Sequence, residues 1–223
     1  MISAADREHL DQEGYVMMRA LLSRARVEQL SHSLPEGVAG LRKALQWPAV
    51  AALANDSGIL SVVEDLTGLS LTPVRGLLFD KSPCANWSVG WHQDLALALK
   101  EQKEVTGFGP WSIKAGVPHA HAPRELLEQM ITLRFHLDSC TEHDGPLRVL
   151  PGSHRNGRIP SSEAEAWERE VGVTCIADIG DMLVMRPLLL HASHSASIPT
   201  RRRVLHLEYG PTALPGGLEW SKT

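Results

Sequence analysis

Three His-x-Asp pairs occur in the chain, and each places an imidazole and a carboxylate two residues apart. On a β-strand, residues i and i+2 point to the same face, so such a pair can bind one metal ion. Two histidines and one carboxylate that leave the other metal positions open are typical of non-haem Fe(II) oxygenases. His9 and Asp11 fall in a predicted helix, where residues two apart point in different directions, and this excludes them as a chelating pair.

His92 and Asp94 have the most suitable context of the remaining pairs. Residues 87–91 lead into them with the pattern of a strand, which would place both side chains on one face. His136 and Asp138 also fall on a predicted strand, and they are the alternative pair. We therefore expect His92 and Asp94 to be two of the three protein ligands of a metal ion.

The third ligand of such a triad must come from a distant part of the chain. His191 is the candidate because it follows the largely apolar stretch 182–190, and His194 is its competitor. Ser193 shares the face of His191, and Arg202 stands at the start of the next predicted strand. A guanidinium fixed on a strand can bind a carboxylate through two hydrogen bonds, so Arg202 is a candidate to hold a carboxylate-bearing cosubstrate.

The first 70 or so residues are predicted to be mostly helical. Ser3 is a plausible N-cap for a short helix that ends near Gln12, and Ser23 is one for a helix over 24–34. A further helix is predicted over 38–45. We expect these helices to support the elements that carry the chemistry.

In the rest of the chain the hydrophobic pattern changes to a period of two, which predicts strands with one apolar and one polar face. Apolar and polar residues alternate in 131–138 and again in 202–209, and the polar sets include Arg134, His136 and His206. Such strands form either a sheet with its polar face in water or a β-sandwich with a polar-lined interior. The presence of Arg and His on two strands favours the second interpretation.

The segment 100–124 combines several glycines and prolines with Trp111, His119 and His121. A long ordered loop of this kind often covers an active site. We expect a lid here, and the alternative is a disordered insertion.

Composition excludes several classes of protein. The 223 residues are 43% hydrophobic and 22% charged, as in ordinary globular domains, and all-β folds of this length often form one domain. The net charge of -4 lacks the positive excess with which nucleic-acid-binding proteins neutralise phosphates. We therefore expect a single domain over 1–223 and no nucleic-acid partner.

The cysteines and the N-terminus bear on the location of the protein. Cys84, Cys140 and Cys175 are an odd number without a Cys-x-x-Cys pair, which argues against a disulfide framework and a cysteine zinc site. The N-terminus lacks the basic and apolar segments of a signal peptide, and no stretch approaches the roughly 18 apolar residues of a membrane span. The sequence predicts a cytoplasmic protein without a membrane partner.

Several of these motifs occur in an order that resembles the phytanoyl-CoA dioxygenase family of Fe(II)- and 2-oxoglutarate-dependent oxygenases. The motifs are His92-Gln93-Asp94, the stretch 144–154 that begins Asp-Gly-Pro, Gly180-Asp181, and His191-x-Ser193 followed by Arg202. The similarity runs from the Gly-Tyr-Val at 14–16 to about Tyr209, which is nearly the whole chain. It implies a mainly β chain with N-terminal helices (α+β): helical support over about 1–70 and a double-stranded β-helix, or cupin-like jelly roll, over about 71–210.

The resemblance also implies cofactors and residue roles. Fe(II) would be bound by His92, Asp94 and His191, and 2-oxoglutarate and O2 would be the cosubstrates. Arg202 and Ser193 match the residues that hold the distal carboxylate of 2-oxoglutarate. Lys81 resembles a lysine that contacts this cosubstrate in some relatives.

The reaction that the resemblance implies is hydroxylation of a C–H bond, with release of succinate and CO2. Halogenating relatives lack the carboxylate that Asp94 supplies, which argues against halogenation. Arg134, His136, His206 and Trp111 are candidate substrate contacts, and they suit a polar small molecule. The alternative is a non-redox metal-binding jelly roll, either a binding module or a cupin-like isomerase, because a fold does not determine a function.

Overall fold

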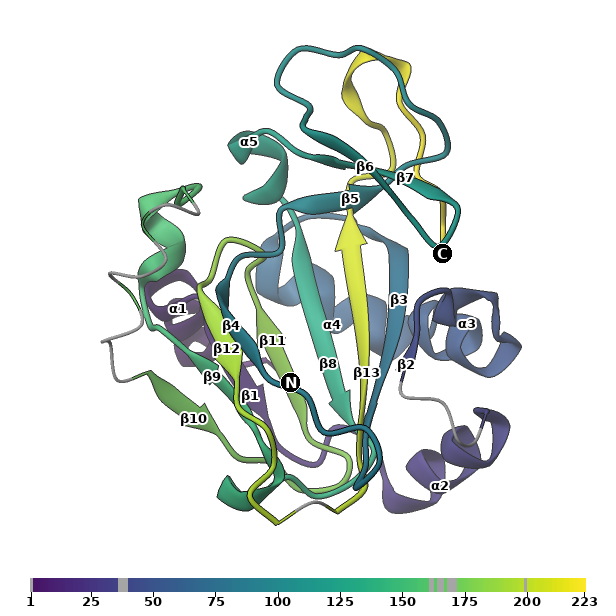
Figure 1. Cartoon of the computed structure of the whole chain (residues 1–223), viewed down its shortest axis with the longest axis vertical. Helices are drawn as coiled ribbons and strands as arrows, with labels where there is room; N and C mark the ends of the chain where they lie inside the picture. The colour runs from purple at the N-terminus through teal and green to yellow at the C-terminus, as the bar shows by residue number, and fades with distance from the viewer. Residues whose placement is uncertain (1, 36–39, 161–162, 164–166, 168–171, 199) are drawn as a thin grey trace.

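The computed structural model describes residues 2–35, 40–160, 163, 167, 172–198 and 200–223. Two antiparallel sheets face each other, and a small third sheet lies beyond one end of them (Figure 1). The major sheet has the strand order β1-β11-β8-β13-β3-β2, and the minor sheet has the order β10-β9-β12-β4. This arrangement is the expected double-stranded β-helix.

The strands of the major sheet are β1 (Tyr15–Met18), β2 (Gly40–Leu41), β3 (Thr72–Lys81), β8 (Ile131–His136), β11 (Met182–Met185) and β13 (Arg202–Gly210). Those of the minor sheet are β4 (Val89–His92), β9 (Leu147–Val149), β10 (Val173–Cys175) and β12 (His191–Ser193). Side chains alternate across the major sheet: Leu133 and Phe135 of β8 pack outward, whereas Arg134 between them points toward the minor sheet. The space between the sheets is therefore lined in part by polar groups, as expected.

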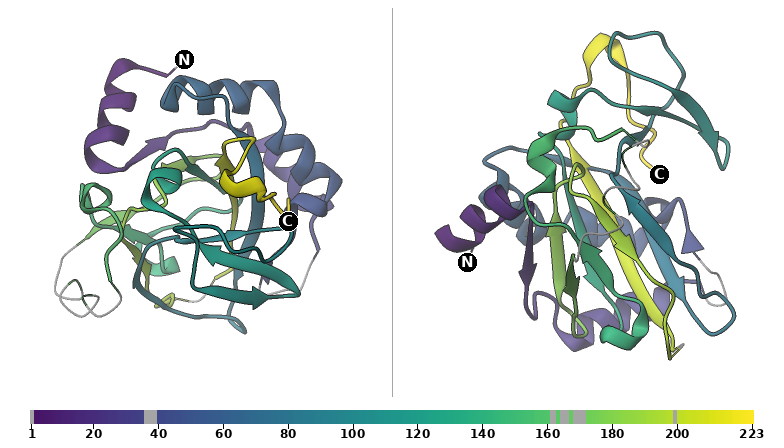
Figure 2. Two further views of the ribbon diagram at one scale, coloured as in Figure 1. Left: turned by 90° about the horizontal axis from the view of Figure 1, so that it is seen from above. Right: turned by 60° about the vertical axis from the view of Figure 1, so that its left-hand side comes forward.

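Helices pack on the outer face of the major sheet (Figure 2), and they are α1 (Ala4–Glu13), α2 (Arg24–Ser33), α3 (Pro48–Ala54) and α4 (Ser57–Thr67). Ser3 and Ser23 cap α1 and α2 as predicted, because each hydroxyl accepts a hydrogen bond from a backbone N–H of the first turn. Leu10 of α1 and Val63 of α4 belong to the apolar cluster that includes Leu133. Each buried side chain of this kind contributes roughly 1.5–3 kcal/mol, so helix packing keeps the major sheet in place.

The prediction of a helix over 38–45 is wrong for residues 40–45. Residues 38 and 39 lie outside the described residues. Residues 40–45 instead contain β2 and the start of the 3-10 helix η1 (Ala44–Gln46). Gly40 pairs with Phe79 at the edge of the major sheet, and a Cβ at residue 40 would lie 2.9 Å from the carbonyl oxygen of Leu78. The close approach of these two backbones requires glycine and overrides the helical pattern.

The segment 100–124 is ordered, so the alternative of a disordered insertion is wrong. It contributes β6 (Trp111–Lys114) and β7 (Val117–His121), which join β5 (Ala96–Ala98) in the small third sheet, and α5 (Arg124–Leu127) begins at its end. Among the described residues, further short helices are η2 (Glu142–Asp144), η3 (Ser153–Asn156) and η5 (Pro215–Gly217). Across the described ranges, no helix has both the length and the apolar character that crossing a membrane requires.

Candidate active site

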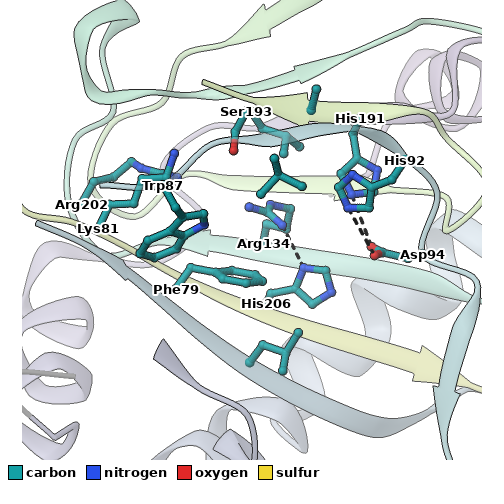
Figure 3. Close-up of a pocket in the computed structure, with 14 residues that line it drawn as sticks. Phe79, Lys81, Trp87, His92, Asp94, Arg134, His191, Ser193, Arg202 and His206 are labelled. Atoms are coloured by element: carbon teal, nitrogen blue, oxygen red, sulfur yellow. Dashed lines mark hydrogen bonds and ion pairs between the residues drawn. The ribbon is translucent and has the colours of Figure 1, made fainter. Parts of the chain in front are cut away.

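Two histidines from adjacent strands of the minor sheet face each other at one end of the sandwich. His92 is the last residue of β4 and His191 is the first of β12, and they are direct partners in the antiparallel register. Their ring centroids lie 4.1 Å apart (Figure 3). Asp94 lies just beyond β4, not on it, and its backbone N–H donates to the carbonyl oxygen of Pro187 at 2.9 Å. The end of β4 and the start of β12 thus bring together three residues from two distant segments.

Backbone carbonyls orient both imidazoles. Nδ1 of His92 lies 2.9 Å from the oxygen of Gly90, and Nδ1 of His191 lies 2.9 Å from the oxygen of Leu189. A carbonyl can only accept, so each Nδ1 carries the proton and each Nε2 keeps a free lone pair. The two Nε2 atoms lie 4.0 and 3.6 Å from the carboxylate oxygens of Asp94, and one candidate ligand atom from each residue falls within 4.8 Å of the others.

The protonation states of this group suit a metal ion. Burial lowers the pKa of His191 to about 3, so its imidazole is neutral. Burial acts to raise the pKa of Asp94, but the neighbouring groups, His191 foremost, outweigh it and hold that pKa below its usual range. Oδ2 of Asp94 is buried and has no hydrogen-bond partner among the described residues, an arrangement that a bound cation would complete. Two imidazole nitrogens and one carboxylate oxygen are the donor set of Fe(II) oxygenases, so the residues fit Fe(II).

The three residues line one end of a cavity of about 210 Å³ between the two sheets. Its described lining residues are Leu77, Phe79, Lys81, Trp87, Val89, His92, Asp94, Arg134, Leu147, His191, Ala192, Ser193, Arg202 and His206. Arg202 and Lys81 lie together at the end opposite Asp94 (Figure 3). Among these lining residues Asp94 is the one acidic side chain, so the cavity carries an excess of positive charge.

Arg202 and Lys81 form a buried pair of cations. They are direct cross-strand partners on β13 and β3, and Nε of Arg202 has no hydrogen-bond partner among the described residues. Nζ of Lys81 donates to the carbonyl oxygen of His194 at 2.7 Å. Burial first, and the charge of Arg202 next, lower the pKa of Lys81 to about 8. Buried like charges favour an anionic ligand beside them, because a counter-charge offsets the cost of their desolvation.

Two of the four residues expected to contact substrate line the cavity, and two do not. Arg134 and His206 line it, and Nη1 of Arg134 donates to Nδ1 of His206 at 2.9 Å. His136 follows Arg134 by two residues on β8 but is buried away from the cavity, where burial lowers its pKa to about 3. Trp111 packs against the apolar cluster of the third sheet. The structure therefore does not bring His136 or Trp111 into the cavity.

The segment expected to form a lid does not reach this cavity. None of the described lining residues comes from 100–124. His119 of β7 is buried, and its Nδ1 lies 2.9 Å from the carbonyl oxygen of Val117. In this structure the segment supports the end of the sandwich through apolar packing.

The competing metal ligands lie elsewhere. Nε2 of His194 accepts from Nη1 of Arg148 at 2.7 Å, away from the triad. The carboxylate of Asp138 is ion-paired with the guanidinium of Arg203 at 2.7 Å. Neither residue belongs to the cluster of candidate ligands.

Sequence reasoning missed several cavity residues. Phe79 shares the inner face of β3 with Leu77 and Lys81, so the alternation around Lys81 was a usable signal. Trp87 lies in the connection between β3 and β4, with Nζ of Lys81 5.6 Å from its ring centroid. No periodic pattern indicates that contact, because a loop sets it.

Comparison with known proteins agrees with this geometry. The family model for phytanoyl-CoA dioxygenase (PhyH) matches residues 76–204, and no curated protein matches the sequence. The carbocyclase SnoK from nogalamycin biosynthesis, described as non-heme and alpha-ketoglutarate dependent, superposes with a TM-score of 0.73 at 15% identity over 95% of this chain and 85% of its own. EctD from S. alaskensis with 2-oxoglutarate and 5-hydroxyectoine superposes with a TM-score of 0.72 at 20% identity, over 95% of this chain and 77% of its own. HygX from Streptomyces hygroscopicus with nickel and 2-oxoglutarate bound superposes with a TM-score of 0.70 at 16% identity, over 95% of this chain and 88% of its own.

At identities of 20% or less, these structural likenesses establish the fold alone. The family match is stronger evidence, because it covers more than half of the chain and includes His92, Asp94, His191 and Arg202. The chain therefore belongs to the phytanoyl-CoA dioxygenase family of Fe(II)- and 2-oxoglutarate-dependent oxygenases.

Proposed function

We propose that this protein hydroxylates an unactivated C–H bond of a polar small molecule and converts 2-oxoglutarate to succinate and CO2. One observation carries the proposal: a cluster of three candidate metal ligands and a pair of buried cations occupy opposite ends of one cavity. 2-Oxoglutarate has a carboxylate at each end, so a cavity with a metal site at one end and two cations at the other can hold both.

His92, Asp94 and His191 would hold the Fe(II) and leave its remaining positions for the cosubstrates. When bound, Fe(II) with 2-oxoglutarate and O2 supplies the oxidising chemistry, in which one oxygen atom enters the substrate and the other enters succinate. The hydrogen bonds from Nδ1 of each histidine to a backbone carbonyl keep both imidazoles oriented toward the ion.

Arg202 and Ser193 would hold the distal carboxylate of 2-oxoglutarate. Arg202 is buried and keeps its charge at any physiological pH, and its planar guanidinium matches a carboxylate. Lys81 adds a second positive charge next to Arg202. Because the surroundings exclude water, these interactions are stronger than they would be at the surface.

The metal end of the cavity is the more open end, and we place substrate entry there. The side chain of His92 is 41% exposed and that of Asp94 is 29% exposed, whereas Arg202 and Lys81 are buried. The polar side chains of the lining, Arg134 and His206 among them, suit a polar molecule. The EctD structure contains the small polar compound 5-hydroxyectoine together with 2-oxoglutarate, which supports this substrate class.

Anaerobic addition of Fe(II) and then 2-oxoglutarate tests the proposal through the visible charge-transfer absorption that a keto acid gives when it chelates Fe(II). Wild type should develop the band, His92→Ala should fail to bind the metal, and Arg202→Ala should bind the metal but require far more 2-oxoglutarate. A wild-type protein that binds a metal but never 2-oxoglutarate would contradict the proposal and favour a non-redox binding module.

A further inference from the structure

Arg134 is a buried guanidinium that neither the metal ligands nor the distal-carboxylate site explains. It lines the cavity, is 6% exposed, and its Nε has no hydrogen-bond partner among the described residues. Nη1 donates to Nδ1 of His206 at 2.9 Å. A histidine that accepts through one nitrogen is an uncharged imidazole, so this hydrogen bond orients Arg134 without neutralising its charge.

Charged side chains also lie beside the other nitrogen of His206. Because a guanidinium can only donate, Nδ1 of His206 is the acceptor and Nε2 carries the proton. Nε2 lies 3.4 Å from the carboxylate of Glu208 without a hydrogen bond to it, and this carboxylate is ion-paired with Nη1 of Arg75 at 3.0 Å. The charge of Glu208 is thus balanced by Arg75, and the positive charge of Arg134 remains available to a ligand.

The position of Arg134 indicates which ligand that is. Figure 3 places it between the Arg202 end of the cavity and Asp94 at the metal end. Charges at both ends act on it: burial first, and then the charge of Arg202, lower the pKa of Arg134 to about 10, and Asp94 acts in the opposite direction. Its guanidinium lies 5.4 Å from the ring centroid of Phe79, which covers one side of it. The uncovered N–H groups therefore adjoin the space that a ligand must cross to reach from Arg202 to the metal site.

The cavity lining offers Arg134 no other counter-charge. Asp94 is the one acidic side chain among the described lining residues, and it would serve the metal ion. A carboxylate of 2-oxoglutarate at the metal end would adjoin both the ion and the guanidinium of Arg134, and a counter-charge there offsets the cost of burying this cation. We infer that Arg134 binds the metal-end carboxylate of 2-oxoglutarate and that His206 is the positioning residue that orients it. This inference rests on the proposed function.

The test is anaerobic titration of the Fe(II)-loaded protein with 2-oxoglutarate, and separately with pyruvate, which keeps the keto acid group but lacks the distal carboxylate. Arg134→Gln should raise the dissociation constants of both keto acids by about 10–100-fold, the loss expected for a hydrogen bond between charged groups. Arg202→Ala should weaken 2-oxoglutarate alone. Arg203→Gln is the matched control. Arg203 follows Arg202 on β13 and pairs with Asp138 outside the cavity, so its loss removes an arginine charge and should leave the affinity for both keto acids unchanged.

Two variants separate the role of His206 from general damage to the fold. Asn can place an acceptor near the position of Nδ1, so His206→Asn should keep 2-oxoglutarate affinity within about threefold of wild type. His206→Leu lacks the acceptor and should lose about tenfold. Fe(II) affinity measured without any keto acid should stay constant across all these variants, a result that damage to the metal site would not give.

Several results would overturn the inference. If wild type gives the charge-transfer band and Arg134→Gln binds both keto acids as wild type does, Arg134 does not serve the cosubstrate. If Arg134→Gln weakens 2-oxoglutarate but not pyruvate, Arg134 acts at the distal end. Should Arg134→Gln fail to fold, Arg134→Lys replaces it, and its unchanged affinity for pyruvate would count against the inference. Absence of the band in wild type would instead contradict the proposed function itself.

Discussion

The side-chain amide of Gln93 donates to the carbonyl oxygen of Leu188 at 2.6 Å, which ties the end of β4 to the segment that leads into β12. The same side chain donates to the oxygen of Gly157 at 2.7 Å and accepts from the N–H of Ile159 at 2.8 Å. Gln93 stands between His92 and Asp94 in the sequence, so these hydrogen bonds hold the backbone that presents two candidate metal ligands.

Replacing Gln93 by Leu should weaken metal binding about tenfold, because groups that support metal ligands typically contribute 10–100-fold to affinity. The measurement is a Co(II) titration of the apoprotein followed by absorption. Gln129→Leu is the control: Gln129 is an exposed amide that donates to the carbonyl oxygen of Glu125 within one segment. Equal Co(II) affinity in both variants would show that Gln93 does not position the site.

Arg202 should prove specific for a planar, bidentate partner. Arg202→Lys keeps the charge but loses the guanidinium, so it should restore only part of the 2-oxoglutarate affinity that Arg202→Ala loses, a loss of about 10–100-fold. Isothermal titration of the metal-loaded protein with 2-oxoglutarate measures both variants. Full recovery in Arg202→Lys would mean that charge alone, without geometry, holds the carboxylate.

Lys81 should make cosubstrate affinity depend on pH. Burial first, and then Arg202 and Arg134, lower its pKa to about 8, and burial raises the pKa of the nearby Cys140 thiol, which keeps the thiol uncharged in this range. Affinity for 2-oxoglutarate should therefore fall as the pH rises through about 8, where Nζ loses its charge. Lys81→Met should bind more weakly at neutral pH and lack this fall. Parallel pH profiles for the two proteins would contradict this assignment.

The lowered pKa of Lys81 should make the free energy of unfolding rise with pH, whereas the affinity for 2-oxoglutarate falls. The unfolded chain holds the proton of Lys81 up to about pH 10.4, whereas the folded chain releases it near pH 8. The unfolded state thus binds more protons between these values, and the contribution of this group to the free energy of unfolding rises with pH. Urea denaturation of wild type and Lys81→Met across this window should show a rise in wild type that the variant lacks. A rise of equal size in both proteins would assign it to other groups.

Asp181 should stabilise the fold without affecting the site. Its buried carboxylate accepts from the backbone N–H of Ala20 at 2.8 Å and from Nη1 of Arg19 at 2.6 Å. Burial acts to raise its pKa, but these hydrogen bonds and that of the Asp178 N–H outweigh it and lower the pKa of Asp181. Asp181→Asn should reduce the free energy of unfolding by about 1.5–3 kcal/mol at neutral pH.

The pH dependence of this effect has a definite sign. A lowered folded pKa gives stabilisation that is complete above the unfolded value of about 3.9 and is lost as the pH falls through the folded value. The difference between wild type and Asp181→Asn in urea denaturation should therefore shrink in acid. Asp65→Asn, at an exposed position, is the control and should change little at either pH. A difference that stays constant into acid would contradict this role for Asp181.

Some features of the site could be predicted from the sequence. The resemblance to a known family identified which His-x-Asp pair to prefer, and the structure pairs its histidine directly with His191 across β4 and β12. The inward direction of Arg134 and His206 follows from simple alternation along β8 and β13. The role of the triad as metal ligands stays a prediction.

Other features depend on contacts that no local pattern contains. Alternation indicates the face of a strand but not the position along it, so His136 shares the side of Arg134 without lining the cavity. Trp111 belongs to a third sheet whose packing depends on distant residues such as Trp220. Gly40 pairs with β3 because of an approach between backbones far apart in the sequence.

The most direct test of the central claim is succinate formation by anaerobically purified protein given Fe(II), 2-oxoglutarate and O2. Wild type should form succinate in a metal-dependent reaction even without a substrate, and His92→Ala should form none. His9→Ala should behave as wild type, because His9 belongs to the His-x-Asp pair that lies on α1, away from the cavity. Absence of succinate from metal-loaded wild type, or equal succinate from His92→Ala, would contradict the account.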